Sequence, residues 1–290
     1  MATKQQINIC LITDSNYVDL TLSCMNSIRQ SKSYQTQIMF HVIGDGLTDV
    51  QKNKFGRFDE PYFNGCMLSY YDKSKELDDF YSKLKQNSHV SRSACLKFCI
   101  PTILDKIDRT IYIDGDTFVK RDLSDLYNFD LKGKQIAAVK DFGLLRVWRN
   151  ENNPCIKNDT YFQSGLMVFD LKKMRKNRTA DRLLAAKLDK FANDPFMDQN
   201  VFNYVLHDDV TYLPPEYCCS VHKMIQGMKQ YKDVQLLNSL YGTSYSNILE
   251  FIMNAYIFHF HGKKEEMKKN RTLKSFFDEQ SKLTHDFVNC

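Results

Sequence analysis

Two aspartates separated by one glycine follow an apolar run near the middle of the chain. Residues 110–113 read Thr-Ile-Tyr-Ile, and Asp114 and Asp116 come directly after them. A buried strand that ends in this way carries two carboxylates to the rim of a sheet, where open α/β folds bind their ligands. On an extended chain both side chains have the same parity and can reach one side. Two hard oxygen ligands suit Mg²⁺ or Mn²⁺, with a phosphorylated substrate completing the coordination.

The same Asp-Gly-Asp sequence also has a plainer interpretation as a turn. Both residue types favour turns, and a lone Asp-x-Asp is weak evidence for a metal site. The strongly apolar strand before Asp114 favours the metal site. Polar residues at other predicted strand ends favour it further.

These further polar residues lie at predicted strand ends and helix starts. They are Asp14 and Asn16 after the first strand, Asp198 and Gln199 at a late helix, and His259 and His261 beside Gly262. One divalent ion held by Asp114, Asp116 and an imidazole would leave positions for the oxygens of a pyrophosphate. Lys97, Lys263 and Lys264 could add positive charge there. A nucleoside diphosphate bound in this way becomes a good leaving group.

Apolar runs alternate with helical patterns along the chain. Strands are predicted at 7–13, 38–43, 67–71, 110–113, 135–139, 166–171, 210–213 and 257–262, and helices at 18–28, 50–58, 93–104, 179–191 and 198–206. This alternation predicts a parallel, doubly wound sheet. Pro101 is expected to bend or divide its helix. Residues 143–159 show little periodicity, which predicts an irregular loop on the acceptor side.

Composition limits the classes of protein that the chain can belong to. Its 290 residues, 43% hydrophobic, can bury one large core, and a net charge of +5 favours anionic ligands without indicating nucleic acid. Nine cysteines without a Cys-x-x-Cys pair indicate buried thiols in a reducing compartment. No apolar run approaches the length of a membrane span, and the N-terminus leads straight into a strand. A cytoplasmic protein without a signal peptide is therefore expected.

Taken in order, the motifs resemble glycosyltransferase family 8, the retaining family that includes bacterial lipopolysaccharide galactosyl- and glucosyltransferases and glycogenin. The likeness runs from about residue 7 to residue 262. It comprises residues 11–17 as the first strand and uracil-binding turn, 111–116 as the metal motif, 161–165 with 167–174 as the donor-sugar segment, 197–200 as the Asp-Gln pair, and 259–262 as the late His-x-x-Gly.

The resemblance implies a GT-A fold of the α/β class, with a single Rossmann-like mixed sheet flanked by helices. Residues 1–262 would form the catalytic domain, and residues 263–290 a basic, helical C-terminal segment. It also implies a UDP-sugar donor, most simply UDP-glucose or UDP-galactose, with Mn²⁺ or Mg²⁺. The hexose would pass, with retention of configuration, to a glycan, a lipopolysaccharide-type glycolipid or a protein-linked acceptor.

The resemblance also assigns roles to individual residues. The metal ligands would be Asp114, Asp116 and His259, and the donor-binding residues Ile12, Asp14, Asn16, Lys97, Asp141, Gln163, Gly262, Lys263 and Lys264. Asp14 would contact the base, with Asn16 near the ribose, and Asp141 is a candidate for sugar or acceptor hydroxyls. Asp198 would hold donor hydroxyls, with Gln199 beneath the oxocarbenium-like centre. An amide is a poor nucleophile, so same-face attack is favoured over a covalent intermediate.

Three positions depart from the family pattern. Lys97 stands where the family has arginine, which replaces a bidentate contact by a point charge. Gln163 replaces an asparagine and lengthens a sugar contact. Glu265 stands at the position of a family lysine, for which Lys263 or Lys264 can substitute.

Plainer structural roles compete with these assignments. Asp14 and Asp198 could be helix caps, with Gln199 on the surface. His259 and His261 could be structural histidines, and the basic tail could be a solvated surface. A sharper alternative for the tail is contact with anionic lipid headgroups at the inner face of a membrane.

Two other functions remain open at this stage. One is a non-catalytic relative that binds sugar nucleotides, which the three departures permit. The other is a phosphatase of the haloacid dehalogenase type, which also places two aspartates after a strand. That fold requires Thr or Val two positions beyond the second aspartate, where this chain has Phe118, so it is disfavoured.

Overall fold

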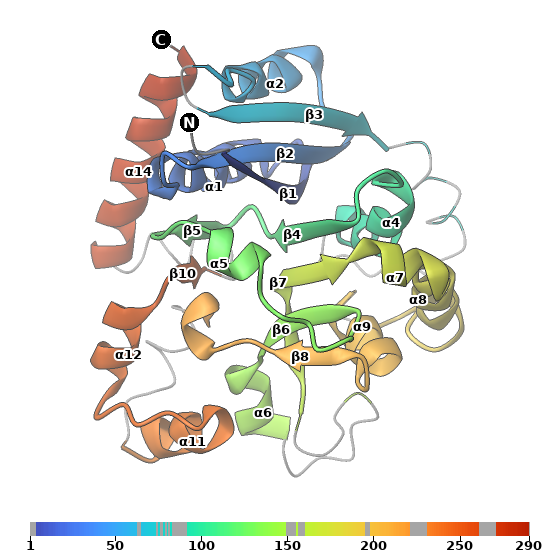
Figure 1. The fold of residues 1–290 in the computed structure, drawn as a ribbon, viewed down its shortest axis with the longest axis vertical. Coiled ribbons are helices and arrows are strands. Elements are labelled where there is room, and N and C mark those ends of the chain that lie inside the picture. The colour runs from blue at the N-terminus through green and yellow to red at the C-terminus, as the bar shows by residue number, and fades with distance from the viewer. Residues whose placement is uncertain are drawn as a thin grey trace.

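The larger sheet has seven strands in the order β3-β2-β1-β4-β7-β6-β8 (Figure 1). The computed structural model describes residues 4–62, 65–73, 75, 78, 80, 82, 92–148, 155, 160–194, 198–220, 231–260 and 271–289. The strands are β1 (Gln5–Asp14), β2 (Thr36–Asp45), β3 (Cys66–Asp72), β4 (Arg109–Ile113), β6 (Ile136–Lys140), β7 (Phe162–Asp170) and β8 (Val210–Tyr212). Each strand expected from an apolar run in this sheet is present, which confirms the α/β class.

The sheet is mixed rather than wholly parallel. β1 pairs in parallel with β2 and β4, and β2 with β3, whereas β7 is antiparallel to both of its neighbours, β4 and β6. The prediction of an all-parallel sheet is therefore wrong at β7, and the mixed Rossmann-like sheet is confirmed. A continuous apolar run indicates burial on both faces and carries no information about strand direction.

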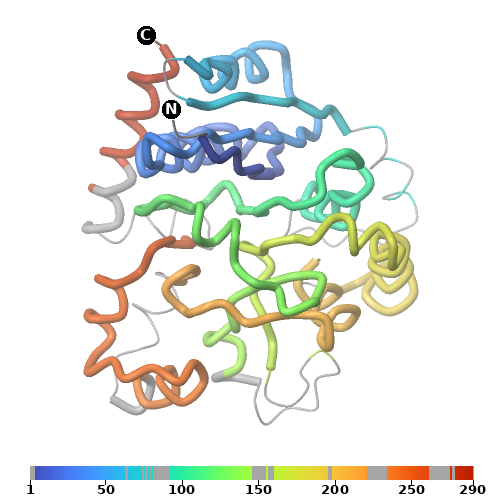
Figure 2. Tube along the Cα trace, viewed as in Figure 1, coloured from blue at the N-terminus to red at the C-terminus, as the bar shows by residue number. Residues whose placement is uncertain are grey.

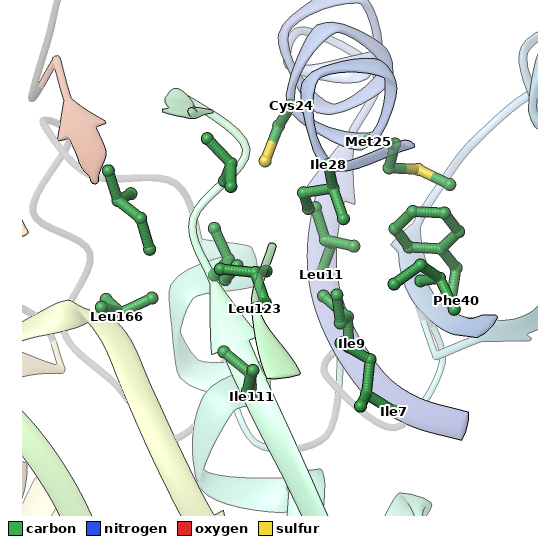
Figure 3. Packing of buried hydrophobic residues seen from close by; sticks show 14 of the residues in the cluster. Ile7, Ile9, Leu11, Cys24, Met25, Ile28, Phe40, Ile111, Leu123 and Leu166 are labelled. Atoms are coloured by element: carbon green, nitrogen blue, oxygen red, sulfur yellow. The ribbon is translucent and has the colours of Figure 1, made fainter. Parts of the chain in front are cut away.

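Alternate side chains of each central strand enter two different cores. Ile9 and Leu11 face α1 (Val18–Ser31), where they pack among Met25 and Ile28 (Figure 3). Cys10, one residue out of phase, belongs to the opposite core. That core is covered by α4 (Leu96–Ile103), α7 (Leu171–Lys176), α8 (Thr179–Asp189) and α9 (Gln199–Leu206). Burial on both faces explains why these strands read as unbroken apolar runs.

The Asp-Gly-Asp segment is a turn between two sheets. β4 ends at Ile113, residues 114–116 turn, and β5 (Thr117–Val119) enters a three-stranded sheet of order β5-β10-β9. The parity argument for Asp114 and Asp116 is therefore wrong, since the chain is not extended there. The other strands of this small sheet are β9 (Cys219–Ser220) and β10 (Ile257–His259). β10 pairs His259 with Thr117 on one side and with Ser220 on the other, which places the histidine beside the turn.

Several helices differ from their predicted limits. The helix expected at 50–58 is divided into α2 (Asp49–Asn53) and η1 (Lys54–Phe58). The helix expected at 93–104 is η2 (Arg92–Cys95) followed by α4, so the division precedes Leu96 and Pro101 lies inside α4. Further helices in the described part of the chain are α5 (Ser124–Tyr127), α6 (Phe142–Trp148), η3 (Pro215–Tyr217), α11 (Tyr231–Tyr241) and α12 (Ile248–Asn254).

The predicted irregular loop at 143–159 is wrong in its first part, where α6 begins directly after Asp141. Asp141 Oδ1 accepts a hydrogen bond from the backbone N–H of Leu144 at 3.0 Å. A carboxylate in this position satisfies an N–H that the first helical turn leaves unpaired, which the periodicity of the segment did not show. Apart from Cys155, the rest of this loop lies outside the described residues.

The C-terminal helix α14 (Arg271–Asn289) lies against α1, beside the N-terminal half of the sheet (Figures 1 and 2). Asn26 donates to Thr284 Oγ1 at 3.2 Å, and the Phe287 ring lies 5.1 Å from that of Phe58 and 4.0 Å from the Arg29 guanidinium. The helical prediction for the tail is confirmed. The proposed boundary at residue 262 lies outside the described residues. Over those residues, no helix is long and apolar enough to span a membrane.

Candidate active site

Asp114, Asp116 and His259 converge, although 143 residues separate the second aspartate from the histidine. One ligand atom from each lies within 4.8 Å of the others. His259 Nε2 lies 3.1 Å from Asp116 Oδ1 and 3.6 Å from Asp114 Oδ2. Burial disfavours the charged imidazole, but Asp116 outweighs it and raises the pKa of His259 well above its usual value. Two carboxylates and one imidazole form a donor set that fits Mn²⁺ or Mg²⁺.

A glycine of the neighbouring strand makes room for this convergence. A Cβ added at Gly165 would lie 2.1 Å from His259 Cε1 and 2.9 Å from Asp114 Oδ2. The backbone of the same glycine accepts a hydrogen bond from the Asp114 N–H at 2.8 Å. Gly165 therefore holds Asp114 through its backbone, and its lack of a side chain leaves room for the His259 ring.

Lys97 links the three metal-ligand candidates, Asp114, Asp116 and His259, to the predicted sugar-binding residues. Its Nζ lies 3.1 Å from Asp114 Oδ1 and 2.8 Å from Asp198 Oδ2, and its side chain is only 5% exposed. Burial disfavours the ammonium, but the two carboxylates outweigh that effect and raise the pKa of Lys97. Tyr112 adds a hydrogen bond from its hydroxyl to Asp114 Oδ1. The charged lysine is therefore held between a metal-ligand candidate and a catalytic candidate.

Asp198 and Gln199 both face the site. The Asp198 side chain does not cap the helix, and Gln199 is not a surface residue. Asp198 precedes α9 but makes no capping hydrogen bond with its side chain, which pairs with Lys97. Gln199 is half-buried, accepts from the Ser164 N–H at 3.2 Å and donates to Asp141 Oδ2 at 3.0 Å. The plainer readings of both residues are wrong. The amide of Gln199 is held at both ends.

The predicted nucleotide-binding turn follows β1. Asp14 Oδ1 accepts from the Asn16 N–H at 2.9 Å, and Oδ2 accepts from the Ser93 hydroxyl at 3.2 Å. Ile12 is buried in β1, whereas Asn16 is exposed. The N-cap of α1 is Tyr17, so Asp14 closes a turn rather than capping the helix.

Gln163 lies on β7, behind the His259 ring. Its side-chain oxygen accepts from Cys218 Sγ at 2.9 Å, and its nitrogen donates to Ser220 Oγ at 3.1 Å. Its sugar contact stays a prediction. His261, Gly262, Lys263, Lys264 and Glu265 lie outside the described residues, so their assignments also stay predictions.

A comparison with protein families decides the class of this site. The model of glycosyl transferase family 8 matches residues 8–268. The chain belongs to glycosyltransferase family 8. The family resemblance is thus confirmed, the family 8 protein is a glycosyltransferase, and the phosphatase interpretation is wrong.

Two relatives of this family 8 transferase are about a quarter identical to it over the aligned residues. General stress protein A of Bacillus subtilis is 23% identical over 248 residues, covering 81% of this chain and 84% of the relative. A lipopolysaccharide 1,2-glucosyltransferase of Escherichia coli is 26% identical over 218 residues, covering 74% of this chain and 62% of the relative.

Solved structures support the fold. The galactosyltransferase LgtC in complex with donor and acceptor sugar analogues superposes with a TM-score of 0.72 at 18% identity, covering 98% of this chain and 95% of LgtC. The bifunctional glycosyltransferase WbbM superposes with a TM-score of 0.70 at 21% identity, covering 91% of this chain and 47% of WbbM. The family 8 transferase therefore has the GT-A fold.

Several residues of the site were not identified from the sequence. Tyr17 is 39% exposed, and burial, followed by the charges of Asp116, Asp14 and Asp114, raises the pKa of its hydroxyl. Its position directly after the Asp14 turn was a usable signal. Gly165 and Cys218 gave none, because their importance depends on where the His259 ring lies.

Proposed function

We propose that this family 8 transferase moves a hexose from a UDP-sugar to a hydroxyl group of a glycan or glycolipid, with retention of configuration. The convergence of Asp114, Asp116 and His259 beside Lys97 supports this proposal most directly. These three residues would hold Mn²⁺ or Mg²⁺, which neutralises the negative charge that develops on a departing diphosphate.

The protein residues would position the donor around this centre. Asp14 would accept from the uracil ring, and the exposed ring of Tyr17 offers a face on which the base can stack. Asn16 would lie near the ribose. Lys97, held between Asp114 and Asp198, would keep the two carboxylates in fixed positions while Asp198 accepts from sugar hydroxyls.

Retention would follow from attack on the same face of the sugar. Gln199 is held by Ser164 and Asp141, which fixes its carbonyl oxygen as a neutral dipole near the electron-poor anomeric centre. A neutral amide stabilises positive charge without readily forming a covalent bond. The acceptor hydroxyl would lose its proton to a phosphate oxygen of the departing UDP.

UDP-glucose and UDP-galactose are the donors to test first. The names of two relatives, a lipopolysaccharide glucosyltransferase and the galactosyltransferase LgtC, favour these hexoses and a lipopolysaccharide-type acceptor. Gln163 stands where the family has an asparagine that contacts the sugar, so we propose the two hexoses without choosing between them.

The decisive experiment measures UDP release from a panel of UDP-sugars with Mn²⁺. We expect slow hydrolysis or transfer with UDP-glucose or UDP-galactose, loss of activity with EDTA, and a loss of at least about 100-fold in Asp116→Ala. Circular dichroism would check that this variant folds. Activity that survives chelation would contradict the proposal. Tight UDP binding without turnover on any sugar nucleotide would instead support a non-catalytic relative.

Peripheral membrane contact through residues 263–290 is proposed on charge alone. α14 contains three basic residues, Arg271, Lys274 and Lys282, and three acidic ones, Asp278, Glu279 and Asp286, so the surplus of lysine lies in residues 263–270. Sedimentation with vesicles of anionic phospholipid should fall steeply with salt if these lysines bind headgroups. Equal sedimentation with uncharged vesicles would exclude this electrostatic contact.

A further inference from the structure

The imidazole of His259 has a polar neighbour on the side away from the aspartates. Its Nδ1 lies 3.9 Å from Cys218 Sγ, whereas its Nε2 faces Asp116. The thiol of Cys218 donates to Gln163 Oε1 at 2.9 Å, and Gln163 Nε2 donates to Ser220 Oγ at 3.1 Å. All four side chains are buried, with exposed fractions of 1–5%. The four form a single hydrogen-bonded chain that leads away from the metal-ligand candidates Asp114 and Asp116.

The direction of these hydrogen bonds determines where the imidazole carries its proton. Because the Cys218 S–H is donated to Gln163, the sulfur is left to accept, and Nδ1–H is the donor that faces it. Nε2 lies 3.1 Å from Asp116 Oδ1, so a proton on Nε2 is donated to that carboxylate. When this proton leaves, the imidazole that remains is protonated at Nδ1, and Nε2 would present its lone pair to the space shared with Asp114 and Asp116.

The strand register builds this arrangement into the fold. β9 and β10 run in parallel, with Ser220 opposite His259. Cys218 and Ser220 are two residues apart and lie on the side of the histidine, whereas Cys219 packs in a separate apolar core with Leu237 and Phe251. On β7, Gln163 and Gly165 are likewise two residues apart, one contacting the thiol and the other leaving room for the ring.

We propose that Cys218 and Gln163 are positioning residues that hold His259 as a metal ligand. Histidine ligands usually donate their second N–H to an acceptor that fixes ring orientation and tautomer, and loss of such a partner typically lowers metal affinity about 10–100-fold. In this chain a buried thiol, itself oriented by an amide, is that acceptor. This inference rests on the metal binding in the proposed function and gives Gln163 a role that does not require contact with the sugar.

The test is a titration with MnCl₂ in the absence of nucleotide, read by the electron paramagnetic resonance signal of free Mn²⁺. We expect Cys218→Ala and Gln163→Leu to raise the Kd for Mn²⁺ about 10-fold or more, and Cys218→Ser to recover part of that loss. Cys219→Ala is the matched control, because it removes a neighbouring buried thiol on the other side of the strand. It should leave the Kd unchanged.

Absorption of the Co²⁺-substituted protein gives a second measurement. A reoriented imidazole alters the ligand field, so the visible bands should shift in Cys218→Ala and not in Cys219→Ala. An unchanged Kd in Cys218→Ala would overturn the inference, as would equal weakening by Cys219→Ala. Absence of Mn²⁺ binding to the unaltered protein, with or without UDP, would instead contradict the proposed function.

Discussion

At the scale of single residues, the Lys97 ammonium joins two parts of the site that sequence reasoning treated separately. It contacts Asp114, a metal-ligand candidate, and Asp198, a candidate for binding the sugar. Without the cation, the half-buried carboxylate of Asp114 and the buried carboxylate of Asp198 would remain close together. Lysine here is thus a structural necessity as well as a charge available to the donor.

Substitution of Lys97 tests this electrostatic role. We expect Lys97→Met to lower the free energy of unfolding by about 3–5 kcal/mol, because it leaves the buried Asp198 carboxylate and the half-buried Asp114 carboxylate without their partner. Lys97→Arg keeps the charge and should recover most of the loss. Urea unfolding of both variants is the measurement. A Lys97→Met variant within about 1 kcal/mol of the unaltered protein would show that the ion pairs contribute little.

Gly165 is a second residue whose role is steric. A methyl group at this position would overlap the His259 ring, so Gly165→Ala should displace the imidazole. The expected result is a rise of about 10-fold in the Mn²⁺ Kd and a loss of about 1–3 kcal/mol in stability. Gly56→Ala is the control, because an added Cβ there would meet nothing within 4 Å. Equal effects of the two substitutions would contradict this steric account.

At the scale of elements, His41 joins the three N-terminal strands. On β2, its Nε2 lies 3.1 Å from Asn8 Oδ1 of β1, and its Nδ1 lies 3.2 Å from the Tyr71 hydroxyl of β3. Burial lowers the pKa of His41 from 6.5 to about 4. The folded protein therefore keeps this histidine neutral at a pH where the unfolded chain binds a proton.

This difference predicts a loss of stability in mild acid. Below pH 6.5 the unfolded state gains a proton that the folded state excludes. The free energy of unfolding therefore decreases as the pH is lowered from 6.5, until His41 also becomes protonated in the folded state near pH 4. The full effect is about 3 kcal/mol. Comparing urea unfolding at several pH values, His41→Gln should flatten the dependence, whereas His285→Gln, at an exposed position, should not. An unchanged slope in His41→Gln would refute the assignment.

At the scale of the whole molecule, α14 is packed against the first half of the domain. Thr284 and Phe287 contact α1 and η1, far along the chain from either element. The red C-terminal tube runs beside the blue N-terminal part of the chain (Figure 2). The predicted C-terminal segment, residues 263–290, therefore contains a helix that packs on the rest of the protein over residues 271–289.

Paired substitutions on α14 test this docking. Phe287→Ala should lower the free energy of unfolding by about 1–2 kcal/mol, since its ring packs on Phe58 and beneath Arg29. Leu283→Ala, on a side chain that is 41% exposed, should change it by less than about 0.5 kcal/mol. Urea midpoints measure both. Equal effects would indicate that α14 contributes no packing of its own.

The sequence by itself determined those features of the protein that depend on residues close together in the chain, such as individual strands and short motifs. Unbroken apolar runs located β1, β2 and β4, and Asp114 and Asp116 were predicted as a pair because they come directly after such a run. The order of several motifs was enough to identify the family, since each motif has its own local composition.

Only the tertiary structure decided how distant segments meet. The direction of β7, the approach of His259 to Asp116, the position of Lys97 between two carboxylates and the thiol behind the imidazole all depend on pairing between remote strands and helices. Strand register and side-chain packing fix these contacts. Local periodicity predicts which face of a helix or strand is buried, but it does not predict which other element covers that face.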